Sequence, residues 1–243
     1  MPFKKVTFES QALHGTVDYL ISVPDGDGPF PTLYLHHGLG DLLEAGRDRT
    51  NIEDFLQGKA LIVVLPYAHT SWGANDPRDE LAWETFLGQE LITEVDLHFP
   101  TIKDRTGRTQ SGFSMGGYVA MMLAFRHAER FSRVYPIAGS YAFGHELRPD
   151  RPSRSEFMMA VAPPDGPYDL FRLAEERAAN PHPLDIRFEV GLQDHLLDVN
   201  RRFQARLNET GVEHAYAEFE GEGHRWSFVS HRLPEIIEFA MGK

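Results

Sequence analysis

Short apolar runs alternate with amphipathic stretches along most of the 243-residue chain. Residues 32–36 and 60–65 are almost continuously apolar, a pattern typical of strands covered on both faces of a parallel sheet. Between Trp83 and Val95 a large apolar residue recurs every fourth position, which predicts one face of an amphipathic helix. Strands and helices are therefore expected to alternate.

The remaining elements follow from the same kind of pattern. Alternation around Val6 and Phe8, a second alternation over 14–23 and a Pro/Gly-rich turn at 24–29 predict an antiparallel pair that leads into the sheet. Gly211 suits the C-terminal cap of the helix before it, and we expect Pro234 to break the last helix. Further strands are expected at 108–113, 133–138, 184–190 and 215–219, and further helices at 51–56, after 113, at 168–179, at 196–207 and at 226–241.

This order predicts an α/β protein with a mostly parallel central sheet, antiparallel N-terminal strands and helices on both faces. Neither a repeat nor a linker divides the sequence, so residues 1–243 are expected to form a single domain. The periodic pattern breaks at about 140–167, a stretch rich in Pro, Arg, Gly and Asp. A loop of this length in a compact domain predicts a lid or flap.

The side chains of this stretch admit two interpretations each. Its apolar residues either face a bound acyl group or anchor the loop to the core (Phe143, Phe157, Met158 and Met159). Its arginines either contact an anionic substrate or are solvated surface charges (Arg148, Arg151 and Arg154). The composition of the stretch favours an apolar acyl or aryl group as the ligand.

Acidic residues outnumber basic ones by 36 to 24, for a formal net charge of −12. This balance disfavours nucleic acid and anionic membrane surfaces as partners. The apolar runs are too short to span a bilayer, and the first residues lack the apolar core of a signal peptide, so a cytoplasmic protein is expected. The absence of cysteine excludes disulfides, thiolate catalysis and cysteine-based zinc sites.

The segment Gly112-Phe113-Ser114-Met115-Gly116 has the pattern G-x-S-x-G between a predicted strand and an apolar helix. That context predicts a nucleophile elbow, a sharp turn that points the Ser114 hydroxyl outward. Glycine on either side of the serine avoids a collision of a Cβ with the crossing backbone. Ser114 is therefore the candidate nucleophile.

A serine nucleophile needs a base and a group that orients the base, in the chain order Ser, acid, His on such a fold. Asp194 lies just past a late strand; its rival Asp198 lies at the start of the next helix, where an N-cap is the simpler interpretation. His224 lies in a Gly-rich loop after the last strand, a better place for a base than His214 or His231. We predict Asp194 and His224 as the partners of Ser114, and no role follows from the pattern for His195.

Acyl transfer also needs donors for the oxyanion. The backbone N–H groups of Met115 and Leu39 are the candidates, the second in the Gly-rich loop after strand 32–36, whose simpler interpretation is a plain turn. His36 and His37 are adjacent on a strand and point to opposite faces, which argues against metal chelation. Trp72 follows another strand end and either walls a substrate pocket or packs.

Four segments together resemble the α/β-hydrolase superfamily, and within it the putative-esterase or esterase D group, which includes tributyrin-type and feruloyl esterases and S-formylglutathione hydrolases. The segments are 35–41, 112–117, 191–203 and 223–226. The resemblance implies Ser114 as nucleophile, His224 as base and Asp194 as the orienting acid, with no metal or organic cofactor. The polar strand before Ser114 departs from the family pattern. The absence of cysteine disfavours a glutathione thioester as substrate.

We therefore predict a serine carboxylesterase that hydrolyses short-chain or aryl esters through an acyl-enzyme. The proposed pocket residues are Trp72, Phe143 and Phe157. Two alternatives remain open: a transacylase with the same triad, and a non-catalytic ligand-binding module on the same fold. The expected partner is a small ester, and the sequence leaves a homo-oligomer open.

Overall fold

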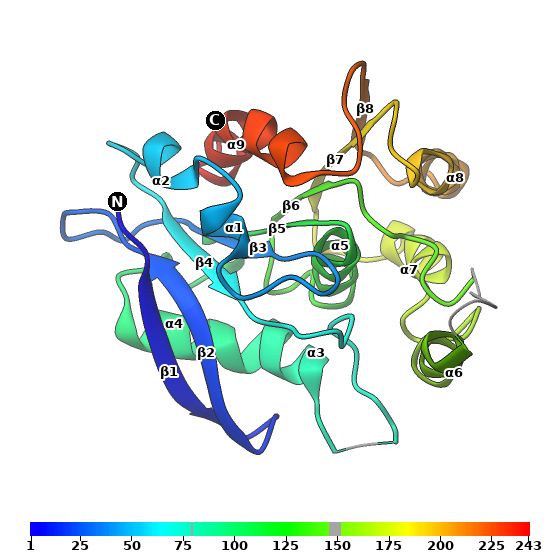
Figure 1. The fold of residues 1–243 in the computed structure, drawn as a ribbon, viewed down its shortest axis with the longest axis horizontal. Helices are drawn as coiled ribbons and strands as arrows, with labels where there is room; N and C mark the ends of the chain where they lie inside the picture. The colour runs from blue at the N-terminus through cyan, green and yellow to red at the C-terminus, as the bar shows by residue number, and fades with distance from the viewer. Residues whose placement is uncertain (79, 146–151) are drawn as a thin grey trace.

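The computed structural model describes residues 1–78, 80–145 and 152–243. An eight-stranded sheet runs through its centre in the order β1-β2-β4-β3-β5-β6-β7-β8 (Figure 1). The first two strands pair antiparallel to each other, and β2 pairs antiparallel with β4. All later pairs are parallel. The strands are β1 Lys4–Ser10, β2 Gly15–Ser22, β3 Thr32–His36, β4 Ile62–Pro66, β5 Arg108–Phe113, β6 Arg133–Ile137, β7 Asp185–Gly191 and β8 Ala215–Phe219.

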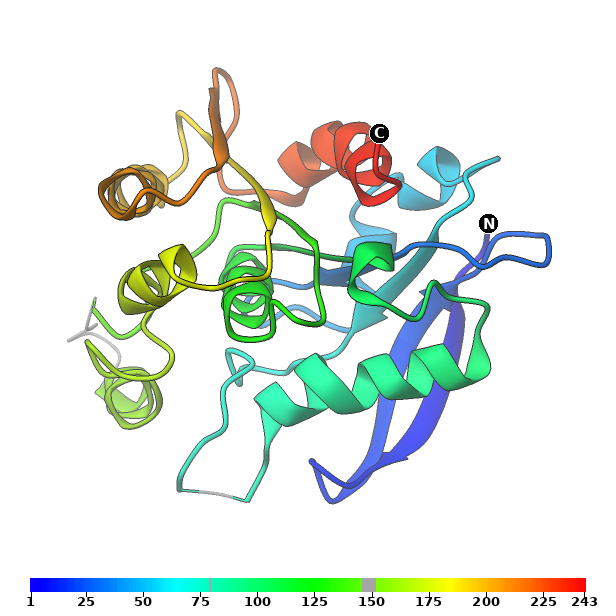
Figure 2. The same cartoon turned by 180° about the vertical axis from the view of Figure 1, so that it is seen from behind.

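Helices cover both faces of the sheet (Figures 1 and 2). Each face has its own apolar cluster. On one face pack α3 Trp83–Thr85, α4 Leu91–His98, α5 Met115–Arg126, α6 Pro152–Val161, α7 Leu170–Ala178 and α8 Leu197–Thr210. On the other pack α1 Ala45–Asp48, α2 Ile52–Phe55 and α9 Trp226–Ala240. The arrangement is the α/β-hydrolase fold, and the predicted fold class is confirmed.

The central strand β5 is buried along its whole length despite its polar sequence. Gln110 and Ser111 are fully buried, and each is hydrogen-bonded inside the sheet region. The Oε1 of Gln110 lies 2.6 Å from Nε2 of His36, and the Ser111 hydroxyl donates to the carbonyl of Tyr135 at 2.5 Å. Buried polar groups are tolerated when they are paired in this way.

Three local predictions need correction. The last helix runs unbroken through Pro234, although a proline removes one hydrogen bond of the helix. Leu233 before it and Ile236 after it are buried in the same apolar cluster, which holds both parts of the helix against the sheet. Asp198 is not the N-cap of α8: Leu196 holds that position, and Asp198 pairs with Arg202 at 3.0 Å. The predicted helix around 83–95 contains a π-helical segment, Phe86–Glu90, between α3 and α4. The left-handed cap at Gly211, with φ of 73°, is confirmed.

The interval 140–167 contains a helix, α6, that the apolar pattern did not predict. Residues 146–151, with Arg148 and Arg151, lie outside the described residues. Only Met158 and Val161 of α6 are buried, too few to produce an apolar stripe in the sequence. None of the helices in the described parts of the chain combines the length and the apolar character needed to cross a bilayer.

Candidate active site

The carboxyl ends of six neighbouring strands converge on one cavity of about 370 Å³. Each of these strands is followed by a segment that contributes to its wall, and α6 adds two further side chains. This is where ligands bind in open α/β sheets. The wall consists of Leu39, Trp72, Ser114, Ser140, Ala142, Phe143, Arg154, Met158, His195, Leu196, Val199 and His224.

Ser114 occupies the strained turn between β5 and α5. Its φ is 59° and its ψ is −115°, outside the regions that residues with a Cβ ordinarily adopt. The backbone crosses itself closely here: a Cβ on Gly112 would lie 2.3 Å from the carbonyl oxygen of Gly116, and a Cβ on Gly116 would lie 2.3 Å from that of His36. The two glycines therefore permit the turn that exposes the serine hydroxyl to the cavity.

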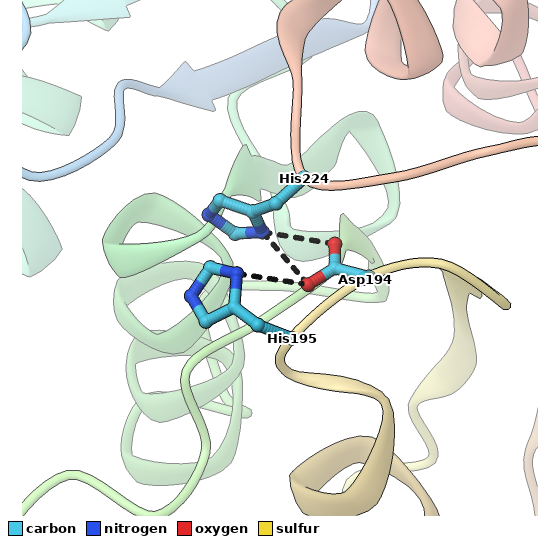
Figure 3. Close-up of side chains that lie close together, drawn as sticks. All are labelled: Asp194, His195 and His224. Atoms are coloured by element: carbon cyan, nitrogen blue, oxygen red, sulfur yellow. Dashed lines mark hydrogen bonds and ion pairs between the residues drawn. The ribbon is translucent and has the colours of Figure 1, made fainter.

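Ser114, His224 and Asp194 are brought within hydrogen-bond distance of one another. Nε2 of His224 lies 2.9 Å from Oγ of Ser114, and its Nδ1 lies 2.9 and 3.1 Å from the two carboxylate oxygens of Asp194 (Figure 3 shows the His224–Asp194 pair). An ionised carboxylate only accepts, so Nδ1 carries the proton and Nε2 presents its lone pair to the serine hydroxyl. This arrangement can remove the proton from Ser114.

Asp194 is held firmly in place. Its side chain is fully buried, and Oδ1 also accepts the backbone N–H of Leu196 at 2.8 Å. The segment that carries it lies against the histidine loop, where the N–H of Gln193 donates to the carbonyl of Glu222 at 2.9 Å. A Cβ on Gly191 would lie 2.2 Å from that same carbonyl oxygen, so only glycine permits the approach. The acid and the base are thus positioned by direct backbone contact.

The two candidate oxyanion donors flank Ser114. The N–H of Met115 is the first of helix α5, and the first N–H groups of a helix have no acceptor within it. The positive end of the helix dipole also lies there. Leu39 follows β3 and lines the cavity with 37% of its surface exposed.

His36 and His37 support this region and point in different directions. Nδ1 of His37 donates to the carbonyl of Gly38 at 2.8 Å, while its Nε2 accepts the N–H of Ala68 at 3.0 Å, which requires the neutral ring. Burial lowers the pKa of His37, and burial lowers that of His36 to about 4. Both imidazoles are therefore neutral structural groups near pH 7.

The three predicted pocket residues separate in the structure. Trp72 and Phe143 line the cavity beside Ser114, and their rings stack 4.0 Å apart at an interplanar angle of 6°. Phe157 does not line it; it lines a neighbouring cavity of about 400 Å³ and its ring lies 6.1 Å from that of Phe143. Met158 lines the cavity, whereas Met159 is exposed.

The sequence patterns assigned no role to two residues at this site, Asp41 and His195. Asp41 accepts hydrogen bonds from Gly38 and from the indole of Trp226, and so links the Leu39 loop to the helix after His224. No periodic signal distinguishes such a carboxylate from a surface one. His195 lies edge-on to His224 with ring centroids 4.4 Å apart, and only its adjacency to Asp194 hinted at this (Figure 3).

A metal ion has one candidate group of ligands among the described residues. Potential ligand atoms of Asp194, His195 and His224 all lie within 4.8 Å of one another. Nδ1 of His224 and both oxygens of Asp194 already form the pair described above, so a cation there would displace the hydrogen bonds that orient the imidazole. The geometry favours proton transfer over metal binding at these groups.

The fold and this site define an esterase of the α/β-hydrolase class. The chain belongs to the family described as "Putative esterase", whose profile matches residues 10–240. The recognised family is thereby confirmed, and with it membership of a family of carboxylic ester hydrolases.

Individual similarities are more distant. An esterase of Mycobacterium tuberculosis, MT1326, is 34% identical over 118 residues, which are 45% of this chain and 25% of that protein. The match thus spans a quarter of the mycobacterial protein. An acetyl esterase of Caldicellulosiruptor saccharolyticus is 26% identical over 86% of this chain and 82% of its own. The solved structure of FphF, a fluorophosphonate-binding serine hydrolase of Staphylococcus aureus, has a TM-score of 0.87 and 20% identity, with 100% of this chain and 99% of that chain covered.

Proposed function

We propose that this chain is a serine carboxylesterase that hydrolyses short-chain or aryl esters through an acyl-enzyme. The observation that carries the proposal is the continuous path of hydrogen bonds from Asp194 through His224 to Ser114, which ends at the wall of a small cavity. A nucleophile, a base and a buried orienting acid in this order constitute the catalytic triad of serine hydrolases.

In the first half of the reaction, Oγ of Ser114 attacks the ester carbonyl carbon while Nε2 of His224 takes the hydroxyl proton. Asp194 holds the imidazole and stabilises its positive form. The N–H groups of Leu39 and Met115 donate to the oxygen that becomes negatively charged. The tetrahedral intermediate then collapses, and the departing alcohol takes the proton from His224.

In the second half, a water molecule replaces the alcohol. His224 accepts one of its protons as the water oxygen attacks the acyl carbon, and the same two N–H groups stabilise the second oxyanion. Collapse returns the proton to Ser114 and releases the carboxylic acid. The proton moves only between His224, Ser114, water and the leaving alcohol.

The size and lining of the cavity support small substrates. About 370 Å³ is near the lower end of ligand pockets. The stacked rings of Trp72 and Phe143 present a flat apolar wall that fits a short acyl chain or an aryl group. The similarity to an acetyl esterase agrees with a short acyl group.

The interval 140–167 is proposed as a flap over this cavity. Its described helix, α6, contributes Arg154 and Met158 to the wall, although the described residues of the interval, 140–145 and 152–167, hold no strand of the sheet. Segments of this kind exclude water and set the width of the site.

The decisive experiment compares the wild type with Ser114→Ala. The wild type should hydrolyse p-nitrophenyl acetate and butyrate and should be labelled by a fluorophosphonate probe at Ser114. Ser114→Ala should lose both while keeping its circular dichroism spectrum. Retention of most activity in the variant would refute the proposal, and ligand binding without labelling would favour a non-catalytic module. Ester products with an added alcohol in place of the free acid would indicate a transacylase.

A further inference from the structure

One buried asparagine lies between the turn of the proposed acid and the loop beside the proposed nucleophile. Asn200, near the start of α8, is fully buried. Its Nδ2 donates to the carbonyl of Leu196 at 2.9 Å and to the carbonyl of Gly139 at 3.0 Å. Because both partners are acceptors, the amide nitrogen and not the amide oxygen must face them, and both of its hydrogens are used. Asn200 therefore joins α8 to the loop that follows β6.

Both ends of this link reach the proposed triad. At one end, the N–H of Leu196 donates to Oδ1 of Asp194 at 2.8 Å. At the other end, the residue after the second carbonyl is Ser140, whose N–H donates to the carbonyl of Ser114 at 3.1 Å. A second path of hydrogen bonds thus connects the acid to the nucleophile, and this path does not pass through the imidazole.

The loop 138–140 has an unfavourable conformation that its surroundings impose. Ala138 has a φ of 48°, in the left-handed region that residues with a Cβ rarely adopt. The backbone of Gly139 also lies close to α5, where a Cβ on Gly117 would lie 2.8 Å from the Cα of Gly139. A strained backbone persists only where several contacts hold it. The hydrogen bond from Nδ2 of Asn200 is one of these contacts.

Packing alone does not account for an asparagine at this position. Within the parts of the chain that the structure describes, its Oδ1 accepts no hydrogen bond, and a buried polar atom without a partner lowers stability. A leucine has the same branching and the same number of side-chain heavy atoms without that penalty. The backbone N–H of Asn200 already donates to the carbonyl of Leu196 at 3.0 Å. What the amide alone supplies is the link to Gly139.

We propose that Asn200 is a positioning residue, whose amide fixes the place of Asp194 relative to Ser114. The inference rests on the proposed esterase function and adds a residue that acts through the triad. Proton transfer between the serine and the base requires a fixed geometry, and a small displacement of the reacting groups lowers the rate strongly. Asn200 is not among the described residues of the cavity wall, so its replacement should lower kcat and leave KM almost unchanged.

Asn200→Leu tests the link. With p-nitrophenyl butyrate we expect kcat to fall by about tenfold or more, while KM changes by less than about threefold. Labelling of Ser114 by a fluorophosphonate should slow by a similar factor, because it needs the same base. In the Asp194→Asn background the position of the acid no longer matters, so the added Asn200→Leu should lower kcat by less than about threefold. A merely structural role predicts equal losses in both backgrounds.

Two further variants of the same helix are the controls. Asn208→Leu replaces an exposed asparagine of α8 and should leave kcat and the labelling rate unchanged. Leu207→Ala removes a fully buried apolar side chain of α8 and should lower the unfolding temperature, while the folded protein keeps its kcat. The second control separates a loss of stability from a loss of alignment.

An unchanged kcat in Asn200→Leu, or the same loss with and without the Asp194 carboxylate, would overturn the inference. Should Asn200→Leu fail to fold, Asn200→Ser takes its place under the same two criteria, because a hydroxyl supplies one hydrogen where the amide supplies two. A wild type that neither hydrolyses esters nor is labelled at Ser114 would refute the proposed function and this inference together. An active wild type with an equally active Asn200→Leu rejects only the inference.

Discussion

The carboxylate of Asp41 accepts a hydrogen bond from the indole N–H of Trp226 at 3.0 Å, across 185 positions of sequence. The same oxygen accepts the backbone N–H of Gly38 at 3.0 Å, and the other oxygen pairs with Arg49 at 2.9 Å. One largely buried side chain thus ties the loop that bears a proposed oxyanion donor to the helix that follows the proposed base.

Asp41→Asn should therefore lower kcat by about tenfold or more, with a smaller change in KM, because the amide places a donor against existing donors and loosens the Leu39 loop. Steady-state kinetics with p-nitrophenyl butyrate measure the split. Trp226→Phe removes the same hydrogen bond by deleting its donor. The loss of kcat in the double variant, expressed as a free energy, should therefore not exceed the sum of the losses in the two single variants.

Asp48→Asn is the control for this prediction, since Asp48 is an exposed partner of Arg47 in the adjacent helix. It should leave kcat unchanged. Equal kcat in Asp41→Asn and the wild type would show that the loop keeps its geometry without the carboxylate.

Asp194→Asn should lower kcat by about ten-thousand-fold, because an amide in place of the buried carboxylate favours the wrong imidazole tautomer. The neighbouring Asp198→Asn supplies the comparison: Asp198 is exposed and pairs with Arg202. That variant should retain wild-type rates. A large loss of kcat in Asp198→Asn with little loss in Asp194→Asn would show that Asp198, and not Asp194, is the orienting acid.

Met158→Ala should shift the preference toward longer acyl chains, since Met158 is buried and lines the cavity beside Phe143. The ratio of kcat/KM for p-nitrophenyl octanoate to that for butyrate is expected to rise about tenfold. Met159→Ala, one residue further along and exposed, should leave the ratio as it is. Identical chain-length profiles for both variants would place the acyl chain elsewhere.

Glu84 forms a buried ionic network that links three segments. Its carboxylate accepts from Arg126 at 2.6 Å, from His127 at 2.9 Å and from Tyr168 at 2.8 Å. Burial raises the pKa of Glu84, but these hydrogen bonds and the charge of Arg126 outweigh it and hold the pKa at about 2. The carboxylate is thus favoured in the folded state.

Glu84→Gln should lower the unfolding free energy at pH 7 by about 3 kcal/mol, since it leaves the half-buried guanidinium of Arg126 without its counter-charge. Because the pKa in the folded state lies below the usual 4.5, this stabilisation is complete above about pH 4.5 and is lost as the pH falls toward 2. Urea unfolding at several pH values measures the difference between variant and wild type.

The exposed pair of Glu176 with Arg172 provides the control for that experiment. Glu176→Gln should change the unfolding free energy by less than about 1 kcal/mol. A difference between Glu84→Gln and the wild type that persists at pH 2 would contradict the linkage.

The central parallel strands could be predicted because burial on both faces requires short, almost continuously apolar runs in the sequence. Thr32–His36 is buried along its whole length and has the expected bounds. Ala215–Phe219 also has the expected bounds, although it is a half-exposed edge strand. In β5, Gln110 and Ser111 each form a buried hydrogen bond. Helix details depended on tertiary context. No local sequence pattern indicates that the last helix continues through Pro234, or that the helix after Trp83 contains a π-helical segment.

Ser114, Asp194 and His224 follow β5, β7 and β8. Their positions could be predicted from fold topology, because the carboxyl ends of parallel strands meet at one edge of a sheet. Their catalytic roles stay predictions until the variants are measured. Which side chains of α6 enter the cavity could not be predicted: Met158 does and Phe157 does not, a difference of one residue that depends on how the helix is rotated.

The cavity wall consists of residues from the segments after six different strands and from α6, and no backbone pairing of the sheet passes through α6. The substrate preference of such an enzyme can therefore change through one segment alone. Exchange of the single stretch around α6 between related sequences would change which esters are accepted, while the proposed nucleophile Ser114 and the proposed base His224 keep their positions.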